Sequence, residues 1–336
     1  MLFAYARFIR EKYTYVIIGA LVAGVTVGLF SSSSGRFIQH FSVPLVFVMI
    51  AAMGFTITLK SLIIAAKDWK SFSLGLGLNF LYAPFVCWLL ARLFLPHHPD
   101  LAAGMILVGA VPCAGMALVW AGLLKGDVPL ATVINAATML VAPLLIPLLI
   151  WLFAGSFIRV DTQGMFKSAL INVLLPILAG IGLRELLQKR MTVMAYLPVM
   201  PALSATAAAL LMFMAINTVT PLVLNDIELL GPLLAATAPV FPILFVTAYL
   251  IGIRLLPRGK NIAVTYSSGM KNLPIALGLA VVSFNELTML PIAVSFGFQM
   301  LTAVLFLRIF SNTAPVVTTT NGKTVLKPSP GIYKKD

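Results

Sequence analysis

The strongest constraint on the fold of this chain is a series of ten long apolar runs that together cover most of its 336 residues. A helix of about 20 apolar residues crosses the hydrocarbon core of a bilayer. Only 10% of the residues are charged, against about 25% in a soluble domain, and the mean hydropathy is +1.04. The chain is therefore predicted to be an all-α integral membrane protein with ten transmembrane helices. The predicted spans are 14–30, 42–59, 72–95, 101–124, 129–154, 164–186, 196–219, 233–256, 261–284 and 288–310.

Lysine and arginine residues are distributed unevenly between the two sides of such a bundle. Arg36, Arg92, Arg159 and Lys167 fall on one side, Lys271 falls inside a span, and the other eighteen of the 23 fall on the opposite side. Basic loops remain in the cytoplasm. We therefore expect a plasma (inner) membrane protein with both termini cytoplasmic. The net charge of +13 then reflects topology and not a nucleic-acid surface.

The span at 261–284 is interrupted at its centre by Gly269, Lys271 and Pro274. Proline removes a backbone donor and clashes with the preceding turn. An ionisable group at membrane depth costs roughly 3 kcal/mol or more, and none of the ten acidic residues lies deep in a predicted span. Irregular backbone at this depth usually lines a cavity. A helix broken there, with a cation at the break, predicts a substrate or ion site.

A second broken span and a weak internal repeat are typical of a secondary transporter. The run 101–124 is interrupted at Pro112 and Gly115, and this break corresponds to the one at Pro274. A repeat of five helices enters the membrane in the opposite direction in its second copy, and paired broken helices mark the binding site of such transporters. We therefore expect two inverted five-helix repeats with broken helices 4 and 9.

The domain organisation is expected to be simple, with one transmembrane domain over 14–310 and a polar cytoplasmic tail over 311–336 without regular structure. Two cysteines, Cys87 and Cys113, exclude a disulfide scaffold and a multi-cysteine metal site. The chain has no nucleotide-binding or hydrolase motif. We therefore expect no enzyme, no cofactor and no metal. The expected partners are the bilayer and a small-molecule substrate.

Three stretches resemble the bile acid:sodium symporter superfamily. Residues 53–56, Met-Gly-Phe-Thr, resemble its second-helix motif, and residues 269–272, Gly-Met-Lys-Asn, resemble its ninth-helix Gly-Met-Gln-Asn. The run from Cys113 to Asp127 resembles the fourth helix of the arsenite efflux permeases, a branch of the same superfamily. The resemblance implies a panel of helices 1, 2, 6 and 7. It also implies a core of helices 3, 4, 5, 8, 9 and 10, with helices 4 and 9 crossing at their breaks.

The sequence departs from this family where the resemblance places sodium ligands. Ser267 stands where relatives carry a glutamate, and Ala117 and Leu118 stand where they carry Ser-Asn. Lys271 replaces the glutamine of the ninth-helix motif. Sodium requires several oxygen ligands, so we expect transport without the usual sodium coupling. Lys271 is expected to occupy the space of the sodium and to satisfy the carbonyl ends of the half-helices.

The candidate substrate-binding residues are polar or soft side chains in or beside the breaks. Cys113 is either a soft ligand for a metalloid or a small buried hydrophobe. Asn79 and Asn135 either face the site or bond to a neighbouring helix. Ser267 and Ser268 either face it or bond to their own helix. The full set is Cys113, Ser267, Ser268, Lys271, Asn272, Asn79 and Asn135, with helix breaks at Pro112, Gly115, Gly269 and Pro274.

These residues leave three functions open. The first is a secondary active transporter of a small organic anion, in which the amino ends of the half-helices and Lys271 supply positive potential. The second is an arsenite or metalloid efflux permease that uses Cys113. The third is a membrane receptor that binds its ligand without transport. Two states of Lys271 also stay open: a permanent charge, and an amine that exchanges a proton during transport.

Overall fold

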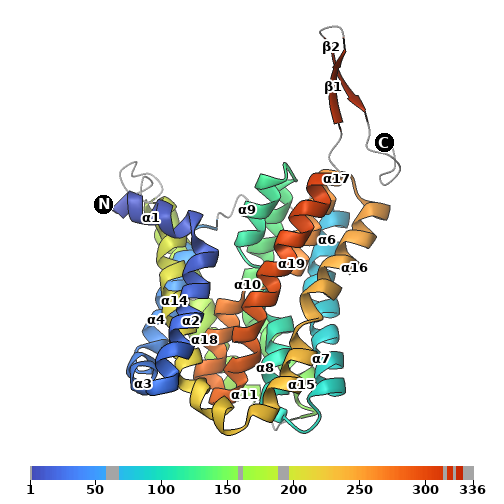
Figure 1. Cartoon of the computed structure of the whole chain (residues 1–336). Helices are drawn as coiled ribbons and strands as arrows, with labels where there is room; N and C mark the ends of the chain where they lie inside the picture. Colours follow the sequence, from blue (N-terminus) through green and yellow to red (C-terminus); the bar gives the residue numbers. More distant parts are fainter. Residues whose placement is uncertain are drawn as a thin grey trace.

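The computed structural model describes residues 2–57, 68–157, 162–187, 197–312, 316–320 and 323–327, and these form a helical bundle with one short hairpin (Figure 1). Six of the described helices are long and apolar enough to cross a membrane, or seven if the bent pair Ser33–Gln39 and Ser42–Gly54 is one span. The all-α membrane class is therefore confirmed. The number is below ten because other apolar stretches are divided into shorter helices.

The helices follow the predicted spans, although the span at 42–59 runs into residues outside the described ranges. The first half contains α1 (Leu2–Glu11), α2 (Tyr13–Phe30), α3 (Ser33–Gln39), α4 (Ser42–Gly54), α6 (Trp69–Gly77), η2 (Leu78–Tyr82), α7 (Ala83–Phe94), α8 (Pro99–Ala110), α9 (Met116–Leu123) and α10 (Val128–Ala154). The second half contains α11 (Thr162–Ala169), η3 (Leu170–Leu174), α12 (Leu175–Leu187), η4 (Leu197–Val199), α14 (Met200–Asn225), η5 (Ile227–Leu229), α15 (Leu230–Thr237), α16 (Val240–Leu255), α17 (Arg258–Gly269), α18 (Leu273–Ser283), η6 (Glu286–Thr288) and α19 (Met289–Asn312).

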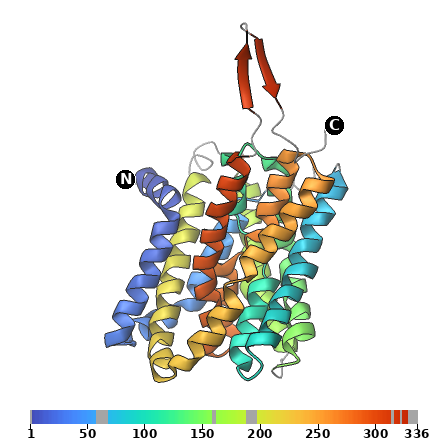
Figure 2. The same cartoon turned by 45° about the vertical axis from the view of Figure 1, so that its right-hand side comes forward.

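Helices α2, α4 and α14 pack together on one side of the molecule, and α6 to α10 with α16, α17 and α19 pack on the other (Figures 1 and 2). Gly24 and Gly28 form a Gly-x-x-x-Gly motif that brings α2 close to α14. A Cβ atom on Gly28 would lie 2.8 Å from the Cβ of Thr220. Without a hydrophobic drive between helices in lipid, such small residues allow the backbones to approach.

The two broken helices cross at their interruptions. α8 ends at Ala110 because Val111 is extended, as expected for a residue before proline. At the crossing, the N–H of Ala114 donates to the carbonyl of Met270 at 2.9 Å, and the N–H of Asn272 donates to the carbonyl of Pro112 at 2.8 Å. These bonds form a short antiparallel bridge in which Cys113 faces Lys271. The predicted crossing of the breaks is therefore present.

The tail contains structure that the sequence prediction missed. Strands β1 (Val316–Thr320) and β2 (Lys323–Lys327) pair antiparallel, with Val316 opposite Lys327 and Thr320 opposite Lys323. Valine and threonine favour strands, and the sequence between the two strands is Asn-Gly, the pair preferred in two-residue hairpin connections. The expectation of a tail without regular structure is therefore wrong for these two strands.

Candidate functional site

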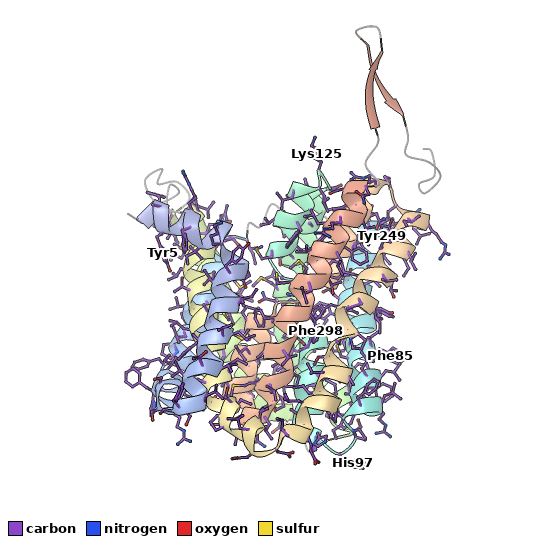
Figure 3. The ribbon with its side chains drawn as sticks, in the orientation of Figure 1. Tyr5, Phe85, His97, Lys125, Tyr249 and Phe298 are labelled. Carbon is purple, nitrogen blue, oxygen red and sulfur yellow. The ribbon has the colours of Figure 1, made fainter. Side chains whose placement is uncertain are left out.

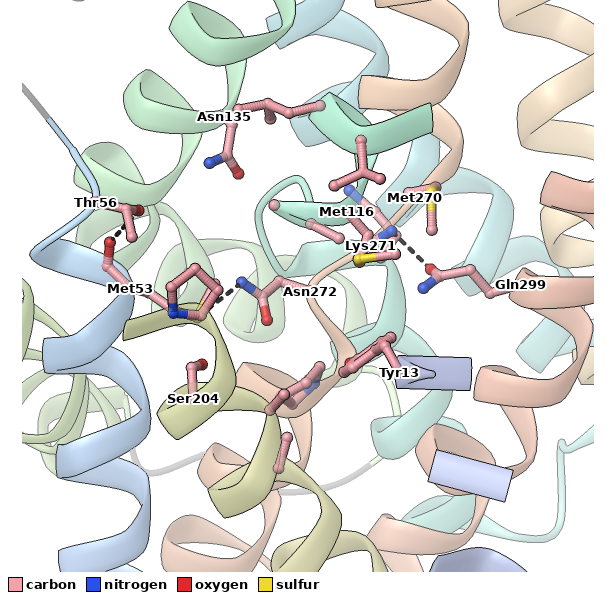
Figure 4. A pocket seen from close by; sticks show the side chains of 18 of the residues that line it. Tyr13, Met53, Thr56, Met116, Asn135, Ser204, Met270, Lys271, Asn272 and Gln299 are labelled. Carbon is pink, nitrogen blue, oxygen red and sulfur yellow. Dashed lines mark hydrogen bonds between the residues drawn. The ribbon is translucent and has the colours of Figure 1, made fainter. Parts of the chain in front are cut away.

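A cavity of about 320 Å³ lies beside the helix crossing, with Asn135, Asn272 and Tyr13 around it (Figure 4). Its walls come from α1, α2, α4 and α14 on one side, from α9, α10 and α19 on the other, and from the crossing itself. This volume suits a small organic molecule. Much of the wall is apolar, and methionine, which adapts its shape to a ligand, is frequent in it. The lining methionines are Met53, Met116, Met139, Met270 and Met300.

Two half-helices begin at this cavity. α9 begins at Met116, after Gly115, and α18 begins directly after Asn272; all three residues line the cavity. By contrast, α17 ends at Gly269, which is buried and is not among the described residues that line the cavity. Backbone N–H groups and the helix dipole make an amino end favourable for negative charge. This wall of the cavity therefore favours an anionic group.

Lys271 is fully buried at the crossing, with 0% of its surface exposed. Its Nζ donates to the backbone oxygen of Asn79 at 2.9 Å and to the side-chain oxygen of the same residue at 3.2 Å. Its backbone N–H donates to Oε1 of Gln299 at 2.7 Å. Two predicted site residues, Lys271 and Asn79, are thus brought into direct contact. Both acceptors of the Nζ atom are neutral.

The π-helical turn η2 explains why the carbonyl of Asn79 is available to Lys271. The N–H of Ala83 donates to Leu78, five residues earlier, instead of to Asn79. The next residue, Pro84, has no N–H to offer. The carbonyl of Asn79 therefore lacks both of the donors that a helix supplies, and it accepts from the lysine. Single π-helical turns of this kind are frequent at functional sites.

The side chain of Asn79 connects η2 to the last turn of α17. Its Nδ2 donates to the carbonyl of Gly75 at 2.9 Å and to the carbonyl of Ser267 at 3.0 Å, while Oδ1 accepts from Lys271. From the sequence, Lys271 is expected to satisfy the carbonyl end of the half-helix. At the carbonyl of Ser267, this expectation is corrected, because the Asn79 amide donates to that carbonyl in place of Lys271. Both oxygens of Asn79 accept hydrogen bonds from the Lys271 Nζ.

Cys113 lies at the crossing, but it is fully buried and is not among the residues that line the cavity. Its Sγ donates to the carbonyl of Ala114 at 3.4 Å, and its backbone N–H donates to Oγ1 of Thr138 at 3.3 Å. Ser267 and Ser268 are also buried away from the cavity wall. These three predicted residues therefore lie around the crossing, outside the cavity wall.

Asn135 and Asn272 do line the cavity, together with the break residues Gly115 and Pro274. Asn272 is 2% exposed, and its Nδ2 lies 3.6 Å from the sulfur of Met53 on α4. Asn135 is 7% exposed, and within the described part of the chain its side-chain oxygen has no hydrogen-bond partner. A buried amide with an unused polar atom at a cavity wall is available to a ligand.

Gln299 on α19 is a site residue that the sequence prediction missed. It is 2% exposed, lines the cavity and holds the backbone of Lys271. The signal was present, since Gln299 is the only amide side chain in the span 288–310. Tyr13 and Ser204 also line the cavity and were not predicted. Tyr13 lies directly before a predicted helix, and Ser204 lies among small residues, so neither has a distinct signal in the sequence.

Comparison with known proteins agrees with the resemblance seen in the sequence. Residues 43–225 match the Sodium Bile acid symporter family. The probable sodium/metabolite cotransporter BASS1, chloroplastic, of Arabidopsis thaliana is 31% identical over 196 residues, which is 58% of this chain and 48% of that protein. The arsenical-resistance protein Acr3 of Alkaliphilus metalliredigens is 27% identical over 191 residues, which is 51% of this chain and 53% of that protein.

A bacterial relative, the uncharacterized sodium-dependent transporter YocS of Bacillus subtilis, is 34% identical over 125 residues, which is 37% of this chain and 38% of that protein. The chain thus spans about half, or less, of the length of these curated relatives. The family match covers more than half of the chain and includes α4 and α14, which line the cavity, as well as both halves of the first broken helix. This chain is therefore a multi-pass membrane protein that belongs to the Sodium Bile acid symporter family, a family of transporters and not of enzymes.

Proposed function

We propose that this protein is a secondary active transporter of a small organic anion and that it lacks the usual sodium coupling, because the Lys271 amine occupies the place of the sodium. The contact of the Lys271 Nζ with both oxygens of Asn79, in a site with 0% exposure, carries this proposal. A buried cation is expensive, so a chain that keeps one at the crossing of two half-helices uses it.

The anionic substrate follows from the cavity. The amino ends of α9 and α18 meet its wall at Gly115 and Asn272, and amino ends favour negative charge. The amides of Asn135 and Asn272 provide polar contacts, and the methionines provide an apolar surface. A molecule with one acidic group and an apolar body matches this arrangement.

Sodium coupling depends on the oxygen ligands at the site. Sodium requires several oxygen ligands. Both oxygens of Asn79 accept hydrogen bonds from Lys271. Ala117 and Leu118, at the positions where the resemblance places a Ser-Asn pair, have no side-chain oxygen. Two relatives are named as a probable sodium/metabolite cotransporter and a sodium-dependent transporter, so this chain would differ from them in a few side chains at the site.

The proposal includes the ten-helix topology, with two inverted repeats, a transmembrane domain over 14–310 and both termini in the cytoplasm. Its panel would consist of α2, α3–α4, α12 and α14, and its core of the remaining spans. Lys125 lies at the same end of the bundle as Tyr5 of α1, and His97 lies at the opposite end (Figure 3). This placement agrees with the grouping of the loops into two sides, and the cytoplasmic assignment is proposed from their basic residues.

A ligand screen followed by uptake tests the proposal. Purified protein is first screened by thermal shift with small organic acids, since a ligand at 100 times its Kd adds about 2.7 kcal/mol of stability. An acid that stabilises the protein is then offered to proteoliposomes in sodium buffer and in potassium buffer. Equal uptake in both is expected. A tenfold sodium dependence, equivalent to about 1.4 kcal/mol of coupling, would contradict the absence of sodium coupling, and binding without uptake would indicate a receptor.

The metalloid exporter is a second candidate because Cys113 lies at the crossing and a relative is an arsenical-resistance protein. The thiol is fully buried and outside the cavity wall, which favours the organic anion. Survival on arsenite of a host that lacks its own exporters separates the two functions.

A further inference from the structure

The N-terminal helix α1 has one face buried against the protein and another face exposed. On the inner face, Ala6 and Ile9 are 3% and 6% exposed. On the outer face, Phe8 is 56% exposed and Tyr5 is 41% exposed, although the Tyr5 hydroxyl reaches Thr206 of α14. The residues packed against the inner face are Val199, Ala202 and Ala205.

The exposed face carries cations beside its aromatic rings. Arg7 and Lys12 are exposed, and the Lys12 Nζ lies 5.5 Å from the ring centre of Tyr15, which is 71% exposed at the start of α2. The sequence from Leu2 to Tyr13 contains only one acidic residue. A helix with aromatic and basic side chains on its outer face is typical of the membrane interface, where anionic headgroups attract it.

The position of α1 agrees with this chemistry. A single residue, Lys12, separates α1 from α2, so α1 lies at the level where a membrane-crossing helix leaves the bilayer. It lies at one end of the bundle, next to α14, and projects outward (Figures 1 and 2). Its inner face also reaches the cavity, because Ile9 and the adjacent Tyr13 are part of the cavity wall.

We propose that α1 is a surface-binding helix that docks on anionic lipid headgroups and, in its docked position, covers one side of the cavity. Phe8 inserts at the headgroup level, while Arg7 and Lys12 contact the lipid phosphates. Ile9 on the opposite face then completes the cavity wall. The lipid composition of the leaflet therefore controls access to the cavity. This proposal depends on the membrane location of the bundle and not on the transported substrate.

Lipid contact is tested with a fluorophore at position 8. Phe8→Cys is labelled with bimane in the full chain, and the native Cys87 and Cys113 stay unlabelled because both are fully buried. Proteoliposomes contain headgroup spin-labelled lipid in phosphatidylcholine, with or without phosphatidylglycerol. Quenching is expected to rise with phosphatidylglycerol. The rise should disappear in Arg7→Gln/Lys12→Gln and persist in the matched control Lys70→Gln/Arg254→Gln, which removes two exposed cations elsewhere.

The cover over the cavity is tested by the reactivity of Ser204→Cys, a position in the cavity wall that is 9% exposed. Each cation near an anionic surface favours docking by roughly fivefold, so two cations lower the undocked population by up to about 25-fold. Maleimide should therefore react more slowly in phosphatidylglycerol vesicles than in phosphatidylcholine alone, and Arg7→Gln/Lys12→Gln should react equally in both. The proposal would be overturned if Ser204→Cys, with Arg7 and Lys12 intact, reacted with maleimide at equal rates in the two lipids. It would also be overturned if the quenching of the fluorophore did not depend on phosphatidylglycerol.

Discussion

The two ends of α17 hold a lysine in opposite ways. Near its start, Lys260 is 37% exposed and forms an ion pair with Asp68 at 3.0 Å. Just beyond its last residue, Lys271 is fully buried and bonds to the neutral oxygens of Asn79. An exposed pair contributes about 0–1 kcal/mol, whereas a cation at membrane depth costs several times more. The first lysine follows ordinary surface chemistry, and the second is the residue on which the proposed function depends.

The largest expected effect comes from removing the buried cation. Lys271→Gln should reduce uptake by at least roughly tenfold, equivalent to about 1.4 kcal/mol, because the positive group at the crossing is lost. Folded protein should remain, since glutamine is neutral and is the residue that the ninth-helix motif of the family carries at this position. The measurement is uptake in proteoliposomes from mildly acidic to mildly alkaline pH, with matched expression.

Lys260→Gln is the control for this variant, because it changes only a surface pair, and it should transport nearly as well as the unaltered protein. Uptake that is flat with pH in the unaltered protein would identify Lys271 as a permanent charge, and uptake that varies with pH would identify a lysine that exchanges a proton. If Lys271→Gln transports normally across the whole range, the contrast between the two lysines has no functional meaning.

The next largest effect concerns the partner of the buried lysine. Asn79→Leu removes one acceptor of the Lys271 Nζ and the donor to the Ser267 carbonyl. An unsatisfied buried polar group costs about 1–3 kcal/mol, so the free energy of unfolding should fall by about 2–3 kcal/mol in thermal denaturation. Asn172→Leu, which alters a half-buried amide in the other π-helical turn, should cost less than 1 kcal/mol by comparison. Equal losses would show that Asn79 has no special connection to the lysine.

A smaller effect is expected at the surface pair. Burial alone raises the pKa of Asp68, but the hydrogen bonds from Lys260 and Ser71 outweigh it and hold the pKa below its usual value. A carboxylate with a lowered folded pKa stabilises the protein above its unfolded pKa, about 3.9, and this stability is lost as the pH falls through the folded pKa. Asp68→Asn should therefore lower stability by no more than about 1 kcal/mol at neutral pH. The difference in melting temperature should shrink near pH 3, and a constant difference would exclude the ion pair as its cause.

The smallest difference is expected between the two cysteines. Cys113→Ser and Cys87→Ser are nearly isosteric changes at fully buried thiols. For an organic-anion transporter the two variants should behave alike in uptake. A selective loss of arsenite resistance in Cys113→Ser would instead assign the function of a metalloid exporter and make the crossing thiol a ligand.

The features that could be predicted from the sequence are those with a local signal. Apolar length located the spans, and Pro112 and Pro274 located the two breaks that cross in the structure. The bond from Lys271 to Asn79 could not be predicted, because it depends on a helix far away in the chain and on the π-helical turn before Pro84. The burial of Cys113 outside the cavity also depends on tertiary packing. The hairpin had a local signal in its valines, threonines and Asn-Gly, which the polarity of the tail obscured.

The backbone bridge at the crossing determines which parts of this protein can move separately. The bonds Ala114 to Met270 and Asn272 to Pro112 fasten one half of the chain to the other, and the Lys271 contact with Asn79 fastens a third helix to them. Opening this bridge would leave backbone groups without partners, at about 1–3 kcal/mol for each one that stays buried. If the cavity opens, we therefore expect this bridge to stay closed and the opposite wall, formed by α1, α2, α4 and α14, to move relative to it.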